Sequence, residues 1–92
     1  MSRKLKIAIV DDEPDMRESI SQWLVLSGFE TETYPSAEDA LKVIGSDWPG
    51  IVVSDIRMPG MDGIAFLKRL MGLDSGLPVI LITGHGDIHM SV

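Results

Sequence analysis

The centre of the chain reads IVVSDIRMPGMDG over residues 51–63. Three β-branched apolar residues lead through a serine to Asp55 and then to a segment rich in proline and glycine, which predicts a short buried strand ending in a loop. Residues 5–10 and 79–82 are also almost continuously apolar, and they predict strands covered on both faces. Residues 29–34 alternate instead, so they predict a half-exposed edge strand.

Helical patterns lie between these strands. Pro14 suits the first turn of a helix and Gly28 suits its end. A second helix is predicted from Ser36 to Gly45, and a third from about Asp62 to Gly72. We expect the apolar side chains of each helix to belong to the core. In the first helix they are Met16, Ile20, Trp23 and Leu24, at the spacing of one helical face.

Strands and helices alternate with short connections. This order predicts right-handed βαβ units and therefore a parallel sheet with helices on both faces. We expect one domain, residues 1–92, with the strand order 2-1-3-4. A fourth helix is predicted to begin near Asp87, and because the sequence ends at Val92 without a stop signal, we expect a domain truncated after the start of this helix.

The composition limits the function. The formal charge is −6 and the eight basic residues are scattered, so we expect no direct contact with nucleic acid. The sequence has no cysteine, which excludes disulfides and thiolate metal sites. Its apolar runs are too short to cross a membrane, and we expect a cytoplasmic protein.

Acidic side chains follow the predicted strands. Asp11 and Asp12 follow the first strand, Asp55 ends the third, and Thr83 ends the fourth. Each carboxylate alone might cap a helix or lie in solvent, but ligands of open α/β sheets bind where such strand ends meet. Like charges at short range raise one another's pKa unless a cation intervenes. A ligand set made only of oxygen atoms favours Mg²⁺ or Mn²⁺.

The loop after the first strand reads DDEPD at residues 11–15 and has no glycine. It would repel a bare phosphate group, in contrast to the glycine-rich phosphate loops of nucleotide-binding folds. The chemistry consistent with this loop is attack by a carboxylate on the phosphorus of a phosphodonor, with a metal offsetting the charge.

Three motifs together resemble those of the receiver domains of two-component response regulators. They are residues 11–13 (DDE), 54–63 (SDIRMPGMDG) and 83–84 (TG). The resemblance covers the whole chain and implies an α/β, flavodoxin-like doubly wound parallel sheet. It also implies a phosphorelay switch rather than an enzyme, phosphorylated by a cognate sensor histidine kinase in a Mg²⁺-dependent reaction.

The resemblance implies roles for individual residues. Asp55 would be the phosphoacceptor, and Asp12 would bind the metal directly beside it. Asp11 would act mainly through metal-bound water, and the backbone carbonyl of Arg57 would complete the metal site. Thr83 matches the switch hydroxyl that hydrogen-bonds a phosphoryl oxygen.

A finer resemblance, at residues 51–67 and 83–87, is to the C4-dicarboxylate transport transcriptional regulators. Longer members carry an AAA+ ATPase domain that acts on sigma-54 polymerase, and a DNA-binding helix-turn-helix. Nodulation and nitrogen-fixation regulators look similar around Thr83. The resemblance therefore implies control of transcription through output domains, and we expect a homodimer.

The end of the chain departs from this family, whose members add a fifth strand and a fifth helix. We expect both to be absent here, together with the family's lysine that pairs with the phosphoryl group. The strand at residues 79–82 would then expose its edge and part of an apolar face. We expect 92 residues either to be unstable alone or to bury this edge against another chain.

Two other classes of protein share features with this sequence. A truncated receiver could act as a dimerisation or assembly module without phosphotransfer. A phosphatase of the haloacid dehalogenase type also uses an aspartyl nucleophile, but its Asp-x-Asp pattern is not matched because Glu13 lies two residues after Asp11.

The other residues near the site are expected to have structural roles. Exposed loop side chains are predicted at Arg57, Met58 and Met61. Backbone geometry is the expected role of Pro59, Gly60 and Gly63. Two histidines, His85 and His89, are expected to shape a partner surface rather than take part in catalysis.

Overall fold

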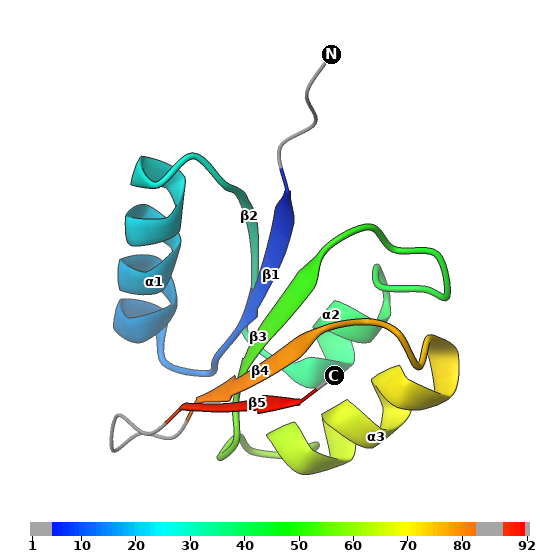
Figure 1. Ribbon diagram of the computed structural model, residues 1–92. Helices are drawn as coiled ribbons and strands as arrows, with labels where there is room; N and C mark the ends of the chain where they lie inside the picture. The colour runs from blue at the N-terminus through cyan, green and yellow to red at the C-terminus, as the bar shows by residue number, and fades with distance from the viewer. Residues whose placement is uncertain (1–4, 83–87, 92) are drawn as a thin grey trace.

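The computed structural model describes residues 5–82 and 88–91 of the chain. Its elements are β1 (Lys6–Val10), α1 (Pro14–Leu26), β2 (Glu30–Tyr34), α2 (Ala37–Leu41), β3 (Ile51–Asp55), α3 (Gly63–Leu73), β4 (Val79–Ile82) and β5 (Ile88–Ser91) (Figure 1). None of the helices in this part of the chain has both the length and the apolar character needed to cross a membrane.

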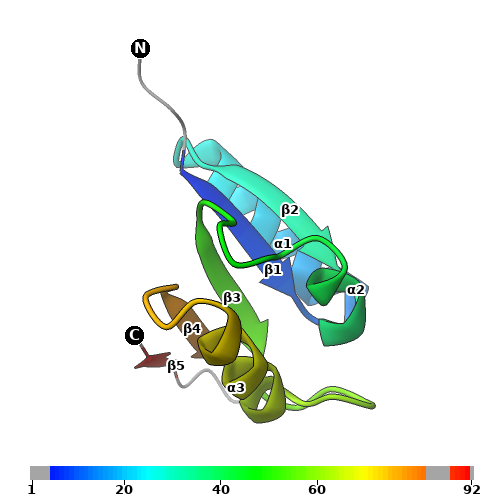
Figure 2. The same cartoon turned by 90° about the vertical axis from the view of Figure 1, so that its right-hand side faces the viewer.

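The strands form a single sheet in the order β2-β1-β3-β4-β5. The first four strands are parallel, and β1 lies between β2 and β3, with Val10 opposite both Tyr34 and Ser54. The predicted order 2-1-3-4 is therefore confirmed. One face of the sheet is covered by α1 and the other by α2 and α3 (Figure 2).

The last strand differs from the prediction. We expected a fourth helix to open near Asp87, which lies outside the described residues, but Ile88–Ser91 form β5 and pair antiparallel with β4. A strand instead gives partners to the backbone groups along the edge of β4. The edge that we expected to be exposed is therefore paired within the chain.

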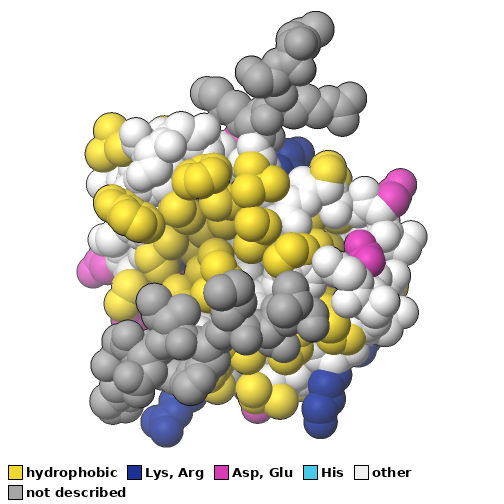
Figure 3. All heavy atoms as spheres, in the orientation of Figure 1, with side chains coloured by type: hydrophobic (Ala, Val, Ile, Leu, Met, Phe, Trp, Pro, Cys, Tyr) yellow, Lys and Arg dark blue, Asp and Glu magenta, His cyan; other side chains and the backbone are white. Residues whose placement is uncertain are grey.

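The apolar side chains of α1 do not all belong to the core. Leu24 is buried and Ile20 is half-buried, but Met16 is 42% exposed and Trp23 is 68% exposed. The prediction of a fully buried face is wrong because, among the described helices, α1 alone covers this face of the sheet, so its flank has no neighbouring helix. Figure 3 shows apolar side chains gathered on this side of the molecule.

The helix ends largely follow the predicted signals. Gly28 follows the C-cap residue of α1, Ser27, and has a positive φ of 98°, a conformation that favours glycine. Ser36 Oγ accepts a hydrogen bond of 3.1 Å from the Asp39 N–H, and Asp62 Oδ1 accepts one of 2.8 Å from the Ala65 N–H. These caps stabilise the first turn of α2, which follows β2, and of α3, which follows β3. The second helix ends at Leu41, earlier than predicted.

Candidate metal centre

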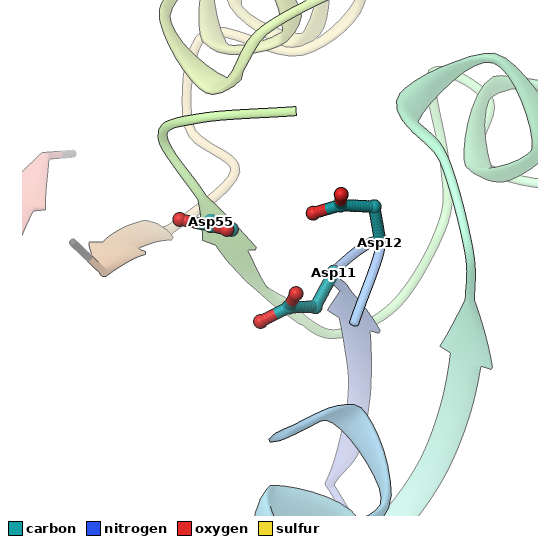
Figure 4. Close-up of side chains that lie close together, drawn as sticks. All are labelled: Asp11, Asp12 and Asp55. Atoms are coloured by element: carbon teal, nitrogen blue, oxygen red, sulfur yellow. The ribbon is translucent and has the colours of Figure 1, made fainter. Parts of the chain in front are cut away.

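Three aspartates meet at one edge of the sheet. Asp11 and Asp12 follow β1, and Asp55 is the last residue of β3. Carboxylate oxygens of the three residues all lie within 4.8 Å of one another (Figure 4). The cause is the parallel pairing of β1 with β3, which brings their carboxyl ends together at the point where the strand order reverses. The predicted convergence of these three carboxylates is confirmed.

Asp11 is the most buried member of this cluster, with a relative exposure of 6%. Burial raises the pKa of its carboxyl, and the charges of Asp55, Asp12 and Glu13 raise it further. A hydrogen bond of 2.9 Å from the Glu13 N–H to Asp11 Oδ1 acts in the opposite direction. The site therefore holds negative charge at an energetic cost that a bound cation would offset.

Asp55 is half-buried at the end of β3. Its Oδ1 accepts a hydrogen bond of 3.3 Å from the backbone N–H of Arg57, and Ser54 Oγ donates one of 3.0 Å to its carbonyl. Gly63, at the start of α3, lies so close that a Cβ there would overlap the Asp55 carbonyl oxygen and the Cα of Ile56. The structural role expected for Gly63 is therefore confirmed.

The loop after Asp55 corrects one side-chain prediction. Arg57 is exposed as expected, but Met58 is only 8% exposed and belongs to the core beneath α2 and α3. Met61 is half-buried against the same core. Because methionine is flexible, it fills irregular gaps, and here it ties the loop to the core rather than extending into solvent.

Some predicted site residues stay untested. Thr83 and His85 lie outside the described residues. Only the backbone of His89 is described: it lies in β5, opposite Leu81 of β4. The role of the Arg57 carbonyl as a metal ligand also stays a prediction.

One residue near the site was not predicted from the sequence. Glu38, in the first turn of α2, accepts a hydrogen bond of 3.2 Å from the Met61 N–H, which lies in the loop after Asp55. An acidic residue in a first helical turn is explained by the helix dipole alone. The sequence therefore carried no signal for this contact.

The cluster fits a hard divalent cation. Its three carboxylates supply only oxygen ligands, and one or two carboxylates with retained water molecules suit Mg²⁺. Asp11, Asp12 and Asp55 are the residues that could hold such an ion.

An open α/β sheet with an aspartate cluster at the reversal of strand order defines the class of this protein: it is a doubly wound α/β protein, and proteins of this class bind their ligands at the carboxyl edge of the sheet. Comparison with known families narrows this class. The response regulator receiver domain family matches residues 7–92. The chain belongs to this family.

Individual relatives agree with this assignment. The C4-dicarboxylate transport transcriptional regulatory protein DctD of Rhizobium meliloti is 48% identical over 92 residues, which are all of this chain and 20% of DctD. The response regulator StyR matches with a TM-score of 0.83 at 39% identity, over 98% of this chain and 46% of StyR. The chain thus spans about a fifth of DctD, and the finer resemblance to the C4-dicarboxylate regulators is confirmed.

A further structural neighbour comes from the complex of the histidine kinase ThkA with the response regulator protein TrrA. The matched chain of that complex superposes with a TM-score of 0.82 at 32% identity, over 90% of this chain and 72% of the neighbour.

Proposed function

We propose that this chain is the phosphoacceptor domain of a two-component response regulator. Asp55 accepts a phosphoryl group from a sensor histidine kinase in a reaction that requires Mg²⁺. The observation that carries the proposal is the meeting of three carboxylates, within 4.8 Å, at the carboxyl ends of β1 and β3. A domain of this kind acts as a switch rather than as an enzyme that turns over a substrate.

The surroundings of the three aspartates favour Asp55 as the nucleophile. Asp11 is buried and accepts a hydrogen bond from the Glu13 N–H, and Asp12 is exposed. Asp55 is half-buried, and a backbone N–H orients one of its oxygens. A carboxylate oxygen of Asp55 would form the bond to phosphorus as the bond to the donor's leaving group breaks.

The remaining site residues have supporting roles in this proposal. Asp12, Asp11 and the Arg57 carbonyl would hold the ion, Asp11 mainly through water. When bound, Mg²⁺ supplies positive charge that offsets the charge of the phosphoryl oxygens. Thr83 would donate a hydrogen bond from its hydroxyl to a phosphoryl oxygen.

The comparisons support the proposed partners. DctD is named as a transcriptional regulator, and TrrA as a response regulator in complex with a histidine kinase. For this chain we therefore propose a histidine kinase as phosphodonor, and AAA+ and DNA-binding output domains in a longer protein. Regulation of transcription would follow from a change at the surface of the phosphorylated domain.

A second candidate is an assembly module that forms a homodimer without phosphotransfer. The observation that favours it is the open flank of α1, where Trp23 is 68% exposed. Exposed apolar surface of this kind commonly marks an interface.

The test is incubation with acetyl phosphate or carbamoyl phosphate and Mg²⁺, followed by intact mass measurement. We expect the wild-type chain to gain one phosphoryl group, and Asp55→Asn to gain none. Asp47→Asn, which changes an exposed acid before the opposite end of β3, should behave like the wild type. Omission of the metal should abolish the gain.

A folded chain that binds Mg²⁺ but gains no mass would contradict phosphotransfer and favour the assembly module. Sedimentation of the same sample would then show whether it is a dimer.

A further inference from the structure

We propose that Glu38 is a positioning residue for the metal site. Its carboxylate holds the loop at residues 56–62 in the shape that presents the Arg57 carbonyl to the cation. This inference rests on the proposed Mg²⁺-dependent function of Asp55, and it adds to that function a residue from another element of the fold.

The contact with Glu38 is made at the tip of the loop, which consists of Gly60 and Met61. The Met61 N–H donates a hydrogen bond of 3.2 Å to Glu38 Oε2. The preceding residue, Gly60, has a positive φ of 75°, and a Cβ built on it would lie 2.8 Å from the same oxygen. The loop therefore turns at a glycine that both adopts the left-handed conformation and leaves room for the carboxylate.

The two ends of the loop are fixed independently of Glu38. At the start, the Arg57 N–H donates to Asp55 Oδ1 at 3.3 Å. At the end, the Gly63 N–H donates to the Ile56 carbonyl at 2.8 Å, which closes the loop on itself. Met58 secures the middle by its burial in the core. Within the described part of the chain, the Glu38 contact is the hydrogen bond that joins the tip of this loop to a different element.

Glu38 can act as a fixed support because its helix is anchored. Ala37 and Ala40, on either side of it in α2, have no exposed surface and pack in the core. The side chain of Glu38 is itself exposed, so its removal leaves no cavity. The effect of removing it should therefore appear in the position of the loop, and hence in metal binding, rather than in global stability.

The experiment compares Glu38→Ala with Glu38→Gln. Alanine removes the hydrogen-bond acceptor, whereas glutamine removes the charge but keeps an oxygen that can accept from the Met61 N–H. Mg²⁺ affinity is measured by calorimetry, and hydrogen exchange of the Met61 amide is followed by NMR in the metal-free chain. For Glu38→Ala we expect Mg²⁺ binding about two- to tenfold weaker and faster exchange at Met61, the range given by loss of one hydrogen bond.

Glu38→Gln should bind Mg²⁺ within about twofold of the wild type, because loss of one exposed charge in water has a small effect. If both variants weaken binding equally, the residue acts through its charge, and the positioning role is overturned. Unchanged binding and unchanged Met61 exchange in Glu38→Ala would overturn it as well.

Failure of the proposed function would give a different result from failure of the positioning role alone. A wild-type chain that does not bind Mg²⁺ at all would overturn both the metal site and the positioning role. A wild-type chain that binds Mg²⁺, with Glu38→Ala identical to it, would overturn the positioning role alone.

Discussion

The buried carboxylate of Asp11 lowers the stability of the fold in which the metal site is formed. It is 6% exposed and has other carboxylates beside it, and burial with these charges raises its pKa. Its ordinary pKa in the unfolded chain is about 3.9. The folded state therefore binds the proton more tightly than the unfolded state, and the free energy of unfolding falls as the pH rises from about 3.9 through the raised folded pKa.

Asp11→Asn should therefore stabilise the metal-free protein at neutral pH. The substitution removes the buried charge but keeps an oxygen that can accept the Glu13 N–H. Urea unfolding in the presence of a chelator should show a higher midpoint for the variant at neutral pH, and the difference should shrink as the pH falls toward about 3.9. A variant that is less stable than the wild type at neutral pH would contradict this account of Asp11.

The aspartate cluster was predictable from the sequence because it depends on strand ends alone. Once β1 and β3 are neighbours, Asp12 and Asp55 must lie at the same edge. Glu38 and Met58 were not predictable, because their contacts depend on how the loop after Asp55 folds back. An exposed acid in a helix and a methionine in a loop have no sequence pattern that reports such a contact.

At the scale of elements, α1 shows what helical periodicity can and cannot predict. The spacing of Met16, Ile20, Trp23 and Leu24 predicted one buried side of the helix. Of these four, Leu24 is buried and Ile20 is half-buried, while Met16 and Trp23 are exposed. Which of them is buried depends on the neighbours of that helix, and periodicity carries no information about them. The same limit applies to β5, whose four residues form a strand because the edge of β4 is available.

Two adjacent residues of α1 test this description. Leu24 is 9% exposed and packs against β1 and β3, so Leu24→Ala should lower the free energy of unfolding by about 2–5 kcal/mol. Trp23 is 68% exposed, so Trp23→Gln should change it by about half a kcal/mol at most. Urea unfolding of the two variants provides the measurement. A loss at Trp23 as large as that at Leu24 would mean that another surface covers Trp23 in solution.

At the scale of the whole molecule, the metal site links binding to folding. Its carboxylates come from β1 and β3, which are distant in sequence and meet only in the completed sheet. A cation that binds the folded chain and not the unfolded chain must stabilise the folded chain by mass action.

Mg²⁺ should therefore raise the melting temperature. At ten times its Kd, the stabilisation is about 1.4 kcal/mol, which for a domain of this size corresponds to about 5–10 °C. Calorimetric scans with and without MgCl₂, at ionic strength matched with NaCl, provide the measurement. Asp55→Asn should lose most of the increase, and an equal increase in that variant would place the Mg²⁺ site elsewhere.

The antiparallel pairing of β4 with β5 also bears on the order in which the chain assembles. Ile82 lies opposite Ile88, so the pairing of β4 with β5 closes only a short loop. In contrast, Ile7 lies opposite Ile51, so the pairing of β1 with β3 must close a long loop of intervening chain. Hairpins close in about 1–10 μs, and contacts between distant residues dominate the folding barrier because loop closure costs entropy before the contacts are made. We therefore expect the edge of the sheet to form early, and the joining of β1 to β3, which creates the acidic cluster, to belong to the slow stage of folding.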